Sequence, residues 1–543
     1  MEAISMYNGQ KSAIFQPAKD FGSAGSIYMM TRVPCFADKK QNNLKFTFKT
    51  GSFDVVNPSV LWEYKVSDKV SSSLNAEHIY TSGKYKFSYK KIDGYDTTTV
   101  RQNGDVQALR IEYGLFGKIT DGEWKAKVYF YDSERGYLGA FVREEPGKFK
   151  NQDRQWDSNF FVQSSFRKNF DKYSLLLNGK YNHDYLHYLS DPRLDVSTMY
   201  IDNKYKQQEV YLSAANRYCI LPILEVSLSG DFQWNTLDAD LFGFVYPTRY
   251  TSLIAAATAL HLERFKLQAS ILGTFVRETT DVVSSAAPSK DEYTPTVMAS
   301  YQPMRGIDFN LRAFYKRIFR MPTLNDLYYT FIGNVNLDPE YTNQYDIGAT
   351  YCKVFGSGIL EALELQVDAY YNEVENKIVA MPTSNQFRWT MVNLGFVEIR
   401  GLDVAAKGSF RFGKDTRLDA RINYTYQKAQ DFTNPNSNFY GGQIPYIPWH
   451  SGSLVLNGSY RRWNLNYSFI YTGERYESQA NIAENYTKPW YTSDFSLSRL
   501  VTWNKKELRL TAEINNIFNQ QYEVVQNYPM PGTNLKSIIN ITI

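Results

Sequence analysis

The chain has 543 residues and a formal net charge of +4, with 43% hydrophobic and 21% charged residues. Its mean hydropathy is −0.44, and no stretch reaches the roughly eighteen consecutive apolar residues of a spanning helix, which excludes a helical membrane protein. The three cysteines are too widely spaced for a disulfide framework or a zinc site, and the nearly balanced charge argues against a nucleic-acid partner.

Aromatic residues are unusually frequent. They make up 16% of the chain, and 43 of them are tyrosines. A tyrosine has an apolar ring and a polar hydroxyl, which suits the boundary between a membrane and water. This composition fits a membrane β-barrel, in which only alternate residues of each strand face lipid.

The first 41 residues differ from those that follow. Residues 1–5 lack the basic start and apolar core of a signal peptide, so we expect the true N-terminus of an exported protein to lie upstream. Glycines and other small residues from Gly22 to Ser26 lead into the short apolar strand Ile27–Met30. We therefore expect two domains, residues 1–41 and residues 42–543.

From Leu44 to the last residue, apolar and polar residues alternate with the period of a β-strand. Clear examples are Leu44–Lys49, Trp124–Phe130, Leu363–Ala369, Leu418–Tyr424 and Leu508–Ile514. One face of each is apolar and the other carries full charges. We count roughly 22 such segments of about 9–14 residues, the length of tilted strands that cross a bilayer.

The connections alternate strictly between short turns, such as Arg461–Arg462, and long loops, such as Arg317–Tyr341 and Asn376–Glu398. An outer-membrane barrel has short turns on one rim and long loops on the other. The fold class is therefore all-β, a single transmembrane antiparallel barrel of about 22 strands. An even strand number places both barrel ends on the short-turn rim, which we expect to face the periplasm. So wide a barrel needs a plug in its lumen.

Several motifs, in this order and spacing, resemble those of the TonB-dependent outer-membrane receptors. They are Phe319–Tyr328 with Gly333–Glu340, Asn393–Gly395 with Gly401–Asp403, Ile444–His450, and Glu513–Asn519 with Gln521 and Tyr522. The resemblance covers Gly22 to Ile543. The chain departs from the family in having Asp403 where glutamate is more usual, and in ending on Ile543 instead of an aromatic residue.

The resemblance implies that residues 1–41 are the C-terminal remnant of the family's plug, with the rest of the plug and its TonB box expected upstream. The chain as given is then not expected to be coupled to energy. The implied function is high-affinity uptake of a scarce nutrient across the bacterial outer membrane, driven by the TonB–ExbB–ExbD complex. The sequences of Phe387–Gly395 and Pro445–Ser453 are similar to those of receptors from Bacteroides-like bacteria. This similarity implies cobalamin as the first ligand and a ferric siderophore as the alternative.

Other implied partners are outer-membrane lipid, lipopolysaccharide and a surface lipoprotein. The candidate ligand-binding residues are aromatic or basic side chains of the long loops, because exposed rings bind flat or greasy ligands well. They are Tyr328, Tyr329, Phe331, Phe387, Arg388, Trp389, Tyr440 and Tyr476. The alternative reading is that these rings pack against one another or against lipopolysaccharide.

Nothing in the sequence indicates an enzyme, a cofactor or a metal site. His183 and His187 share one face of a strand but lie about 13 Å apart, too far to bind one metal ion. Two other functions remain open. A passive porin-like channel would need no plug, and a secreted all-β adhesion protein would not alternate its loop lengths so regularly.

Overall fold

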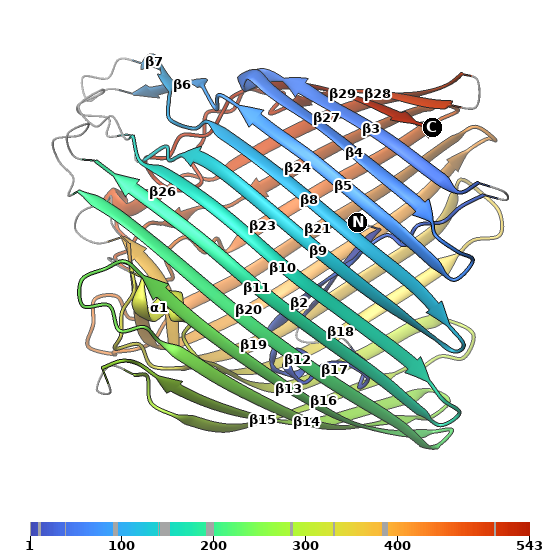
Figure 1. Ribbon diagram of the computed structural model, residues 1–543, viewed down its shortest axis with the longest axis horizontal. Helices are drawn as coiled ribbons and strands as arrows, with labels where there is room; N and C mark the ends of the chain where they lie inside the picture. Colours follow the sequence, from blue (N-terminus) through green and yellow to red (C-terminus); the bar gives the residue numbers. More distant parts are fainter. Residues whose placement is uncertain are drawn as a thin grey trace.

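The computed structural model describes residues 2–8, 12–37, 40–90, 96–139, 141, 152–191, 200–282, 286–329, 332–382, 389–503 and 506–543. Over these residues, a single antiparallel sheet of 22 long strands closes on itself as a barrel (Figure 1). The expected all-β barrel is therefore confirmed. No helix in the described part of the chain is long and apolar enough to cross a membrane.

The barrel strands follow one another in chain order, each paired with the next. The first part of the wall is made of β3 (Asn42–Gly51), β4 (Val55–Lys65), β5 (Val70–Thr81), β8 (Val106–Ile119), β9 (Gly122–Gly136), β10 (Arg154–Asn169), β11 (Tyr173–Ser190), β12 (Ile201–Leu221), β13 (Leu224–Ala239), β14 (Thr248–His261) and β15 (Phe265–Thr279).

The second part is made of β16 (Lys290–Tyr301), β17 (Asp308–Arg320), β18 (Glu340–Val354), β19 (Leu360–Pro382), β20 (Trp389–Phe412), β21 (Thr416–Asp431), β23 (His450–Tyr460), β24 (Trp463–Thr472), β27 (Trp490–Trp503), β28 (Lys506–Asn515) and β29 (Asn534–Thr542). The last strand β29 pairs with the first, β3, and this seam closes the barrel.

The long connections gather at one rim and the short turns at the other (Figure 1). The long-loop rim carries the short strands β6 (Tyr85–Lys90), β7 (Asp96–Arg101), β22 (Gly442–Gln443), β25 (Arg475–Tyr476) and β26 (Tyr486–Thr487), the 3-10 turn η4 (Ala483–Asn485) and helix α1 (Leu324–Tyr328). One connection on this rim departs from the expected alternation. Between β3 and β4 the 3-10 turn η2 (Ser52–Asp54) takes the place of a long loop.

The strand lengths correct part of the sequence prediction. β19 has 23 residues and β20 has 24, well beyond the expected 9–14. A tilted strand of about 9–11 residues already crosses a bilayer, so these strands continue past the membrane as a hairpin. Most of the stretch 376–398, expected to be a loop, is therefore paired strand.

Alternate residues of each strand face opposite sides of the wall. On β19, Leu365 and Val367 are exposed on the outside, whereas the next residue, Asp368, faces the lumen and is only 4% exposed. Gln366, on the same lumenal face, donates a hydrogen bond from Nε2 to Asp368 Oδ2 at 2.6 Å. The apolar and charged faces predicted for this segment are thus those of the membrane and the lumen.

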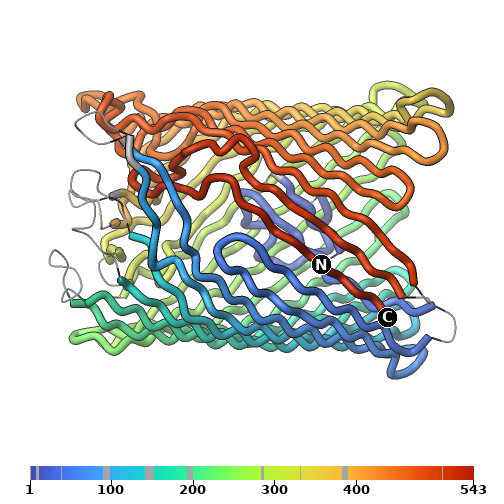
Figure 2. The backbone as a smooth tube through the Cα atoms, turned by 90° about the horizontal axis from the view of Figure 1, so that it is seen from above, coloured from blue at the N-terminus to red at the C-terminus, as the bar shows by residue number. Residues whose placement is uncertain are grey.

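The N-terminal segment lies inside the barrel (Figure 2). It consists of β1 (Ala3–Asn8) and β2 (Gly25–Met30), which pair with each other, and the 3-10 turn η1 (Ala18–Gly22). The two strands form a separate sheet that makes no ladder with the wall in the described residues. The segment is therefore held by side chains, and these contacts define the inner part of the site.

Candidate functional site

Asp231 of β13 is the central contact between the wall and the N-terminal segment. Its carboxylate accepts hydrogen bonds from the backbone N–H groups of Ala18 at 3.1 Å and Lys19 at 2.8 Å. The Tyr211 hydroxyl on β12 donates to the same carboxylate at 2.8 Å. The first amides of a helical turn have no partner within the turn, so a carboxylate placed there binds them well.

Further wall side chains bind the backbone of the same segment. Ser229 Oγ donates to the Gln16 carbonyl at 2.7 Å, and Lys316 Nζ donates to the Ser23 carbonyl at 2.6 Å. Lys316 on β17 is fully buried. Because these bonds go to backbone atoms, they fix the path of the segment with little dependence on its side chains.

An apolar contact completes the attachment. Phe21 and Ile14 of the segment, which are 2% and 3% exposed, pack on the lumenal face of β14 and β15. That face is built from small residues, the alanines at alternate positions 255, 257 and 259, with Leu272 beside them. Small side chains at these positions leave the room that the phenyl ring fills.

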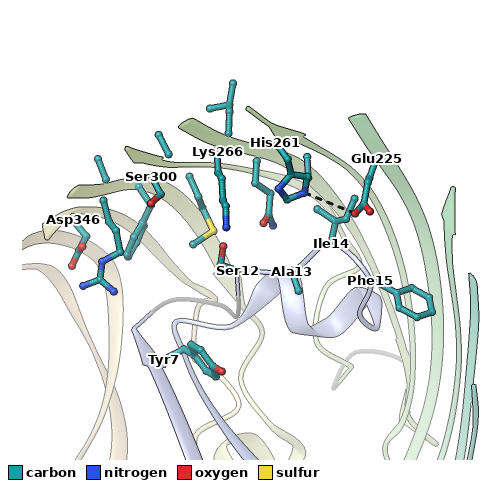
Figure 3. Close-up of a pocket in the computed structure, with 18 of the residues that line it drawn as sticks. Tyr7, Ser12, Ala13, Ile14, Phe15, Glu225, His261, Lys266, Ser300 and Asp346 are labelled. Atoms are coloured by element: carbon teal, nitrogen blue, oxygen red, sulfur yellow. Dashed lines mark ion pairs between the residues drawn. The ribbon is translucent and has the colours of Figure 1, made fainter. Parts of the chain in front are cut away.

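A cavity of about 610 Å³ lies between the segment and the wall from β12 to β19 (Figure 3). Its polar lining is partly paired: Glu225 lies 3.6 Å from Arg217 and 3.9 Å from His261, and Arg312 lies 2.6 Å from Asp368. Figure 3 shows Lys266 pointing from the wall toward Ser12 of the segment. A cavity of this size can hold a small molecule.

At the long-loop rim, α1 is packed as a small core. Leu324, Leu327 and Tyr328 are buried against Tyr205 of β12 and Leu237 of β13. Thr323 caps the helix, because its Oγ1 accepts from Asp326 N at 3.1 Å while the Asp326 carboxylate accepts from Thr323 N at 2.9 Å.

A buried ion pair lies beneath this helix. Arg249 and Glu278 are 2.6 Å apart, with side chains 9% and 1% exposed. Arg249 Nη1 also donates to the Pro322 carbonyl at 2.6 Å, and the Tyr328 hydroxyl donates to Glu278. Tyr328, a predicted ligand residue, is thus only 8% exposed and serves here to hold the loop to the wall.

The structure brings some of the predicted aromatic residues together. The Trp389 ring lies 5.9 Å from the Tyr446 ring, and Tyr446 N donates to the Tyr476 carbonyl at 2.8 Å. Tyr476 in turn packs edge-on against Tyr486 at 5.9 Å. Trp389, Tyr446, Tyr476 and Tyr486 are called the rim aromatic group below.

The other predicted residues lie elsewhere on the rim. Tyr329 packs on Tyr205 with ring centroids 4.5 Å apart, and Tyr440, which is 47% exposed, packs edge-on against Phe432. Phe331, Phe387 and Arg388 lie outside the described residues. Ligand contact by any of these residues stays a prediction.

Burial changes the acidity of several rim side chains. It raises the pKa of Tyr329 and of Tyr446 to about 12 each, so both hydroxyls stay neutral donors at any physiological pH. Burial lowers the pKa of Arg475, whose Nη2 donates to the Lys488 carbonyl at 3.4 Å and the Glu523 carbonyl at 3.3 Å. Arg475 therefore ties two loops together beside Tyr476.

Sequence reasoning did not select Tyr446 or Arg475. Tyr446 lies within the proline-marked motif Ile444–His450, and its φ of +60° is a conformation that non-glycine residues rarely adopt. Pro445 and Pro448 lie on either side of Tyr446 and restrict the backbone, so they were the sequence feature that could have marked this residue. Arg475 carried no such signal, because its burial depends on loops that are distant in sequence.

Residues 36–517 match the family model described as "TonB dependent receptor-like, beta-barrel". The chain belongs to the TonB-dependent receptor family. A closed 22-strand barrel of this family lies in the bacterial outer membrane. Within the described residues, no three histidine, cysteine, aspartate or glutamate side chains are grouped so that they could hold a metal ion.

Curated relatives of this TonB-dependent receptor chain include proteins named vitamin B12 transporter BtuB. One from Vibrio vulnificus is 21% identical over 535 residues, 97% of this chain and 76% of the relative. One from Photobacterium profundum is 28% identical over 215 residues, 39% of this chain and 31% of the relative. For that second relative, the match thus spans about a third of its length.

Solved structures share the fold at low identity. The copper transporter OprC has a TM-score of 0.75 and 14% identity, with 99% of this chain and 85% of that one covered. The siderophore receptor PiuA from Acinetobacter baumannii has a TM-score of 0.75 and 12% identity, with 99% and 86% covered. At these identities the likeness establishes the fold alone.

Proposed function

We propose that this chain is the barrel and inner plug segment of an outer-membrane receptor that imports a scarce nutrient. The observation that carries the proposal is the attachment of the N-terminal segment inside a closed barrel. Side chains such as Asp231 hold it to the wall, and the described residues show no strand pairing between the two, so it can move while the wall stays intact. Residues 1–41 are then part of a plug domain, and the TonB–ExbB–ExbD complex supplies the energy through the N-terminal side.

In this proposal the long-loop rim faces outward and binds the ligand. The rim aromatic group offers ring faces from several loops, and rings give large contact area at little cost in conformational entropy. Tyr329 and Tyr440 are further candidates, together with Phe331, Phe387 and Arg388 outside the described residues. Lipopolysaccharide surrounds this rim, and a surface lipoprotein is an additional proposed partner.

Cobalamin is the first proposed ligand and a ferric siderophore the second. Cobalamin is favoured by the relatives named for vitamin B12 transport. It is also favoured by the sequences of Phe387–Gly395 and Pro445–Ser453, which resemble those of Bacteroides-like receptors. A ferric siderophore stays the alternative that the resemblance to the family implies. Both ligands are too large for passive diffusion through small pores, which is why energised uptake is proposed.

The test is uptake by cells that lack their own receptors and express this protein from its natural locus. Labelled cyanocobalamin and a labelled ferric siderophore are supplied at nanomolar concentration, with and without a protonophore. We expect protonophore-sensitive accumulation of one ligand, reduced roughly tenfold by Trp389→Ala combined with Tyr476→Ala, since stacking on each ring contributes about 0.5–1.5 kcal/mol.

The matched control is Trp503→Ala, a tryptophan that is 73% exposed at the end of β27 on the short-turn rim. It should leave uptake unchanged. Ligand uptake that is unchanged by the protonophore would instead indicate a passive channel. Failure of both ligands to accumulate, with the protein correctly inserted, would reject the proposed ligand class.

A further inference from the structure

A second cavity, of about 590 Å³, lies on the lumenal side of the barrel seam near the short-turn rim. It is lined by β3, β4 and β27–β29 and by Arg32, Cys35, Ala37 and Lys40, which belong to the connection between the N-terminal segment and the wall. No part of the rim aromatic group lines it. We call it the seam cavity.

Cationic side chains dominate the lining of the seam cavity. Arg32, Lys40, Lys45 and Arg509 line it, against two carboxylates, Glu63 and Glu507. Glu63, with a side chain only 3% exposed, is already bound: it lies 3.3 Å from Arg32 Nη2 and accepts from Asn43 Nδ2 at 3.1 Å. The remaining cations, Lys40, Lys45 and Arg509, form no ion pair with another described residue. They outnumber the remaining carboxylate, Glu507, so the described lining carries a net positive charge.

Two of these cations lie on either side of the last strand, in a diagonal arrangement. Lys45 on β3 is paired with Thr542 of β29, and Arg509 on β28 is paired with Asn540, two residues earlier on β29. The β28 neighbour of Thr542 itself is Glu507. Two strand spacings combined with an offset of two residues place the backbones of Lys45 and Arg509 about 12 Å apart. Two long, flexible cationic side chains across that distance can converge on one small anion between them.

The strand between the cations supplies neutral donors. Asn540 Oδ1 accepts from Thr47 Oγ1 at 2.7 Å, which directs the amide nitrogen away from Thr47. Neither that nitrogen nor the Thr542 hydroxyl is hydrogen-bonded to another group in the described part of the chain. The Thr542 hydroxyl lies beside Lys45 and the Asn540 amide beside Arg509. A hydroxyl and an amide next to an ammonium and a guanidinium are donors of the kind that phosphate oxygens accept from.

We propose that the seam cavity is a binding site for a phosphate group, held by Lys45, Arg509, Asn540 and Thr542 and covered by Lys40. Lumenal position favours a soluble phosphate or phosphate ester over a lipid headgroup. The bound anion neutralises the two cations that lie diagonally across β29, and through Lys40 it fastens the connection from the N-terminal segment to the seam. This site is separate from the proposed nutrient site and does not depend on which nutrient is carried.

Cys35 provides a built-in reporter, because it is a free, exposed thiol in the lining of the seam cavity. In the full chain, with Cys219→Ser and Cys352→Ser as background, the rate at which Cys35 forms a mixed disulfide is measured with a negatively and a positively charged methanethiosulfonate, each of which releases methanesulfinate. The test variant combines Lys45→Gln with Arg509→Gln. The matched control is Arg421→Gln on β21, another charged position outside the cavity.

We expect Cys35 to react faster with the negatively charged reagent than with the positively charged one. The ratio of the negative to the positive reagent's rate should fall roughly fourfold or more in the double variant at physiological ionic strength. Inorganic phosphate should slow labelling by a neutral maleimide in the background protein, but not in the double variant. Micelles doped with phosphatidylglycerol form a second arm. Protection by the lipid without protection by inorganic phosphate would assign the site to a headgroup, which would overturn the preference for a soluble ligand.

The site itself is rejected if chloride at equal ionic strength protects Cys35 as well as phosphate does, or if protection persists in the double variant. An unchanged rate ratio in a double variant that keeps its heat-modifiable gel mobility would also reject it. A single Lys45→Arg variant keeps the charge at β3, so protection should be retained there even if the double variant is poorly inserted.

Discussion

Replacing Asp231 with alanine should release the N-terminal segment from the wall. The substitution removes the acceptor for two backbone amides, those of Ala18 and Lys19. A hydrogen bond to a charged acceptor contributes about 1.5–3 kcal/mol, so the two together contribute about 3–6 kcal/mol. Asp231 is only 5% exposed, and removing a buried carboxylate relieves its desolvation. With that offset, we expect attachment to weaken by about 3 kcal/mol.

Hydrogen–deuterium exchange in detergent micelles measures this loss directly. A loss of about 3 kcal/mol corresponds to exchange roughly 100-fold faster at the amides of Ala18 and Lys19. Asp231→Asn should have an intermediate effect, because it keeps one acceptor but turns a donor toward an amide. The control is Asp419→Ala on β21, whose carboxylate accepts from Ser409 Oγ at 2.5 Å on the neighbouring strand and does not touch the segment.

The outcome that refutes this reasoning is exchange at residues 16–24 that does not change in Asp231→Ala. Equal acceleration in Asp419→Ala would be just as damaging, since it would show a general loosening of the wall. Faster exchange confined to β13 and its neighbours would mean that Asp231 stabilises the barrel and not the attachment.

Three other predictions concern the barrel and its rim. Leu365→Arg, on the lipid face, should destabilise the barrel by about 2–4 kcal/mol in urea titrations and lumenal Gln366→Arg far less, and equal costs would show that the register is wrong by one residue. Cysteine at Asn334 or Ser437 should react with an impermeant reagent on intact cells, whereas cysteine at Gly306 or Gly356 should react only after permeabilisation; the reverse pattern would invert the proposed orientation. Glu278→Gln should speed proteolysis around α1, because leaving Arg249 buried without its partner costs about 3–5 kcal/mol, and a loop as resistant as before would show that the pair is not needed.

The barrel could be predicted because its signal is local and repeated. The alternation in Leu363–Ala369 is decided by which side of the wall each residue faces, so it survives in every strand. The extent of β19 and β20 could not be predicted in the same way. Beyond the membrane neither face of a strand meets lipid, and side chains such as Ile378 and Leu394 are buried at the long-loop rim. The described parts of stretch 376–398 therefore lose the alternation while they keep most of their pairing.

The candidate site was less accessible to sequence reasoning. Arg317–Tyr341 was predicted as a long loop, but within it Thr323 and Asp326 form a capping box and Leu324–Tyr328 is helical. Tyr328 was predicted to be an exposed loop tyrosine. Only the fold shows that its hydroxyl donates a hydrogen bond to Glu278, 50 residues earlier in the chain. The burial of a loop residue depends on contacts between segments that are far apart in the chain. The alternation of apolar and polar residues along one segment does not predict such contacts.

The unequal strength of two sets of contacts explains how such a barrel could open without unfolding. Each wall strand pairs with its neighbours along a long ladder. β19, for example, pairs with β20 over most of Leu360–Pro382. In the described residues the N-terminal segment has no ladder with the wall and relies on side-chain bonds such as those of Asp231, Ser229 and Lys316. A force applied along the segment therefore breaks these bonds one after another, while every wall strand resists as a unit. The wall's side chains bind mainly backbone atoms of the segment, so the same bonds can form again when the force ends.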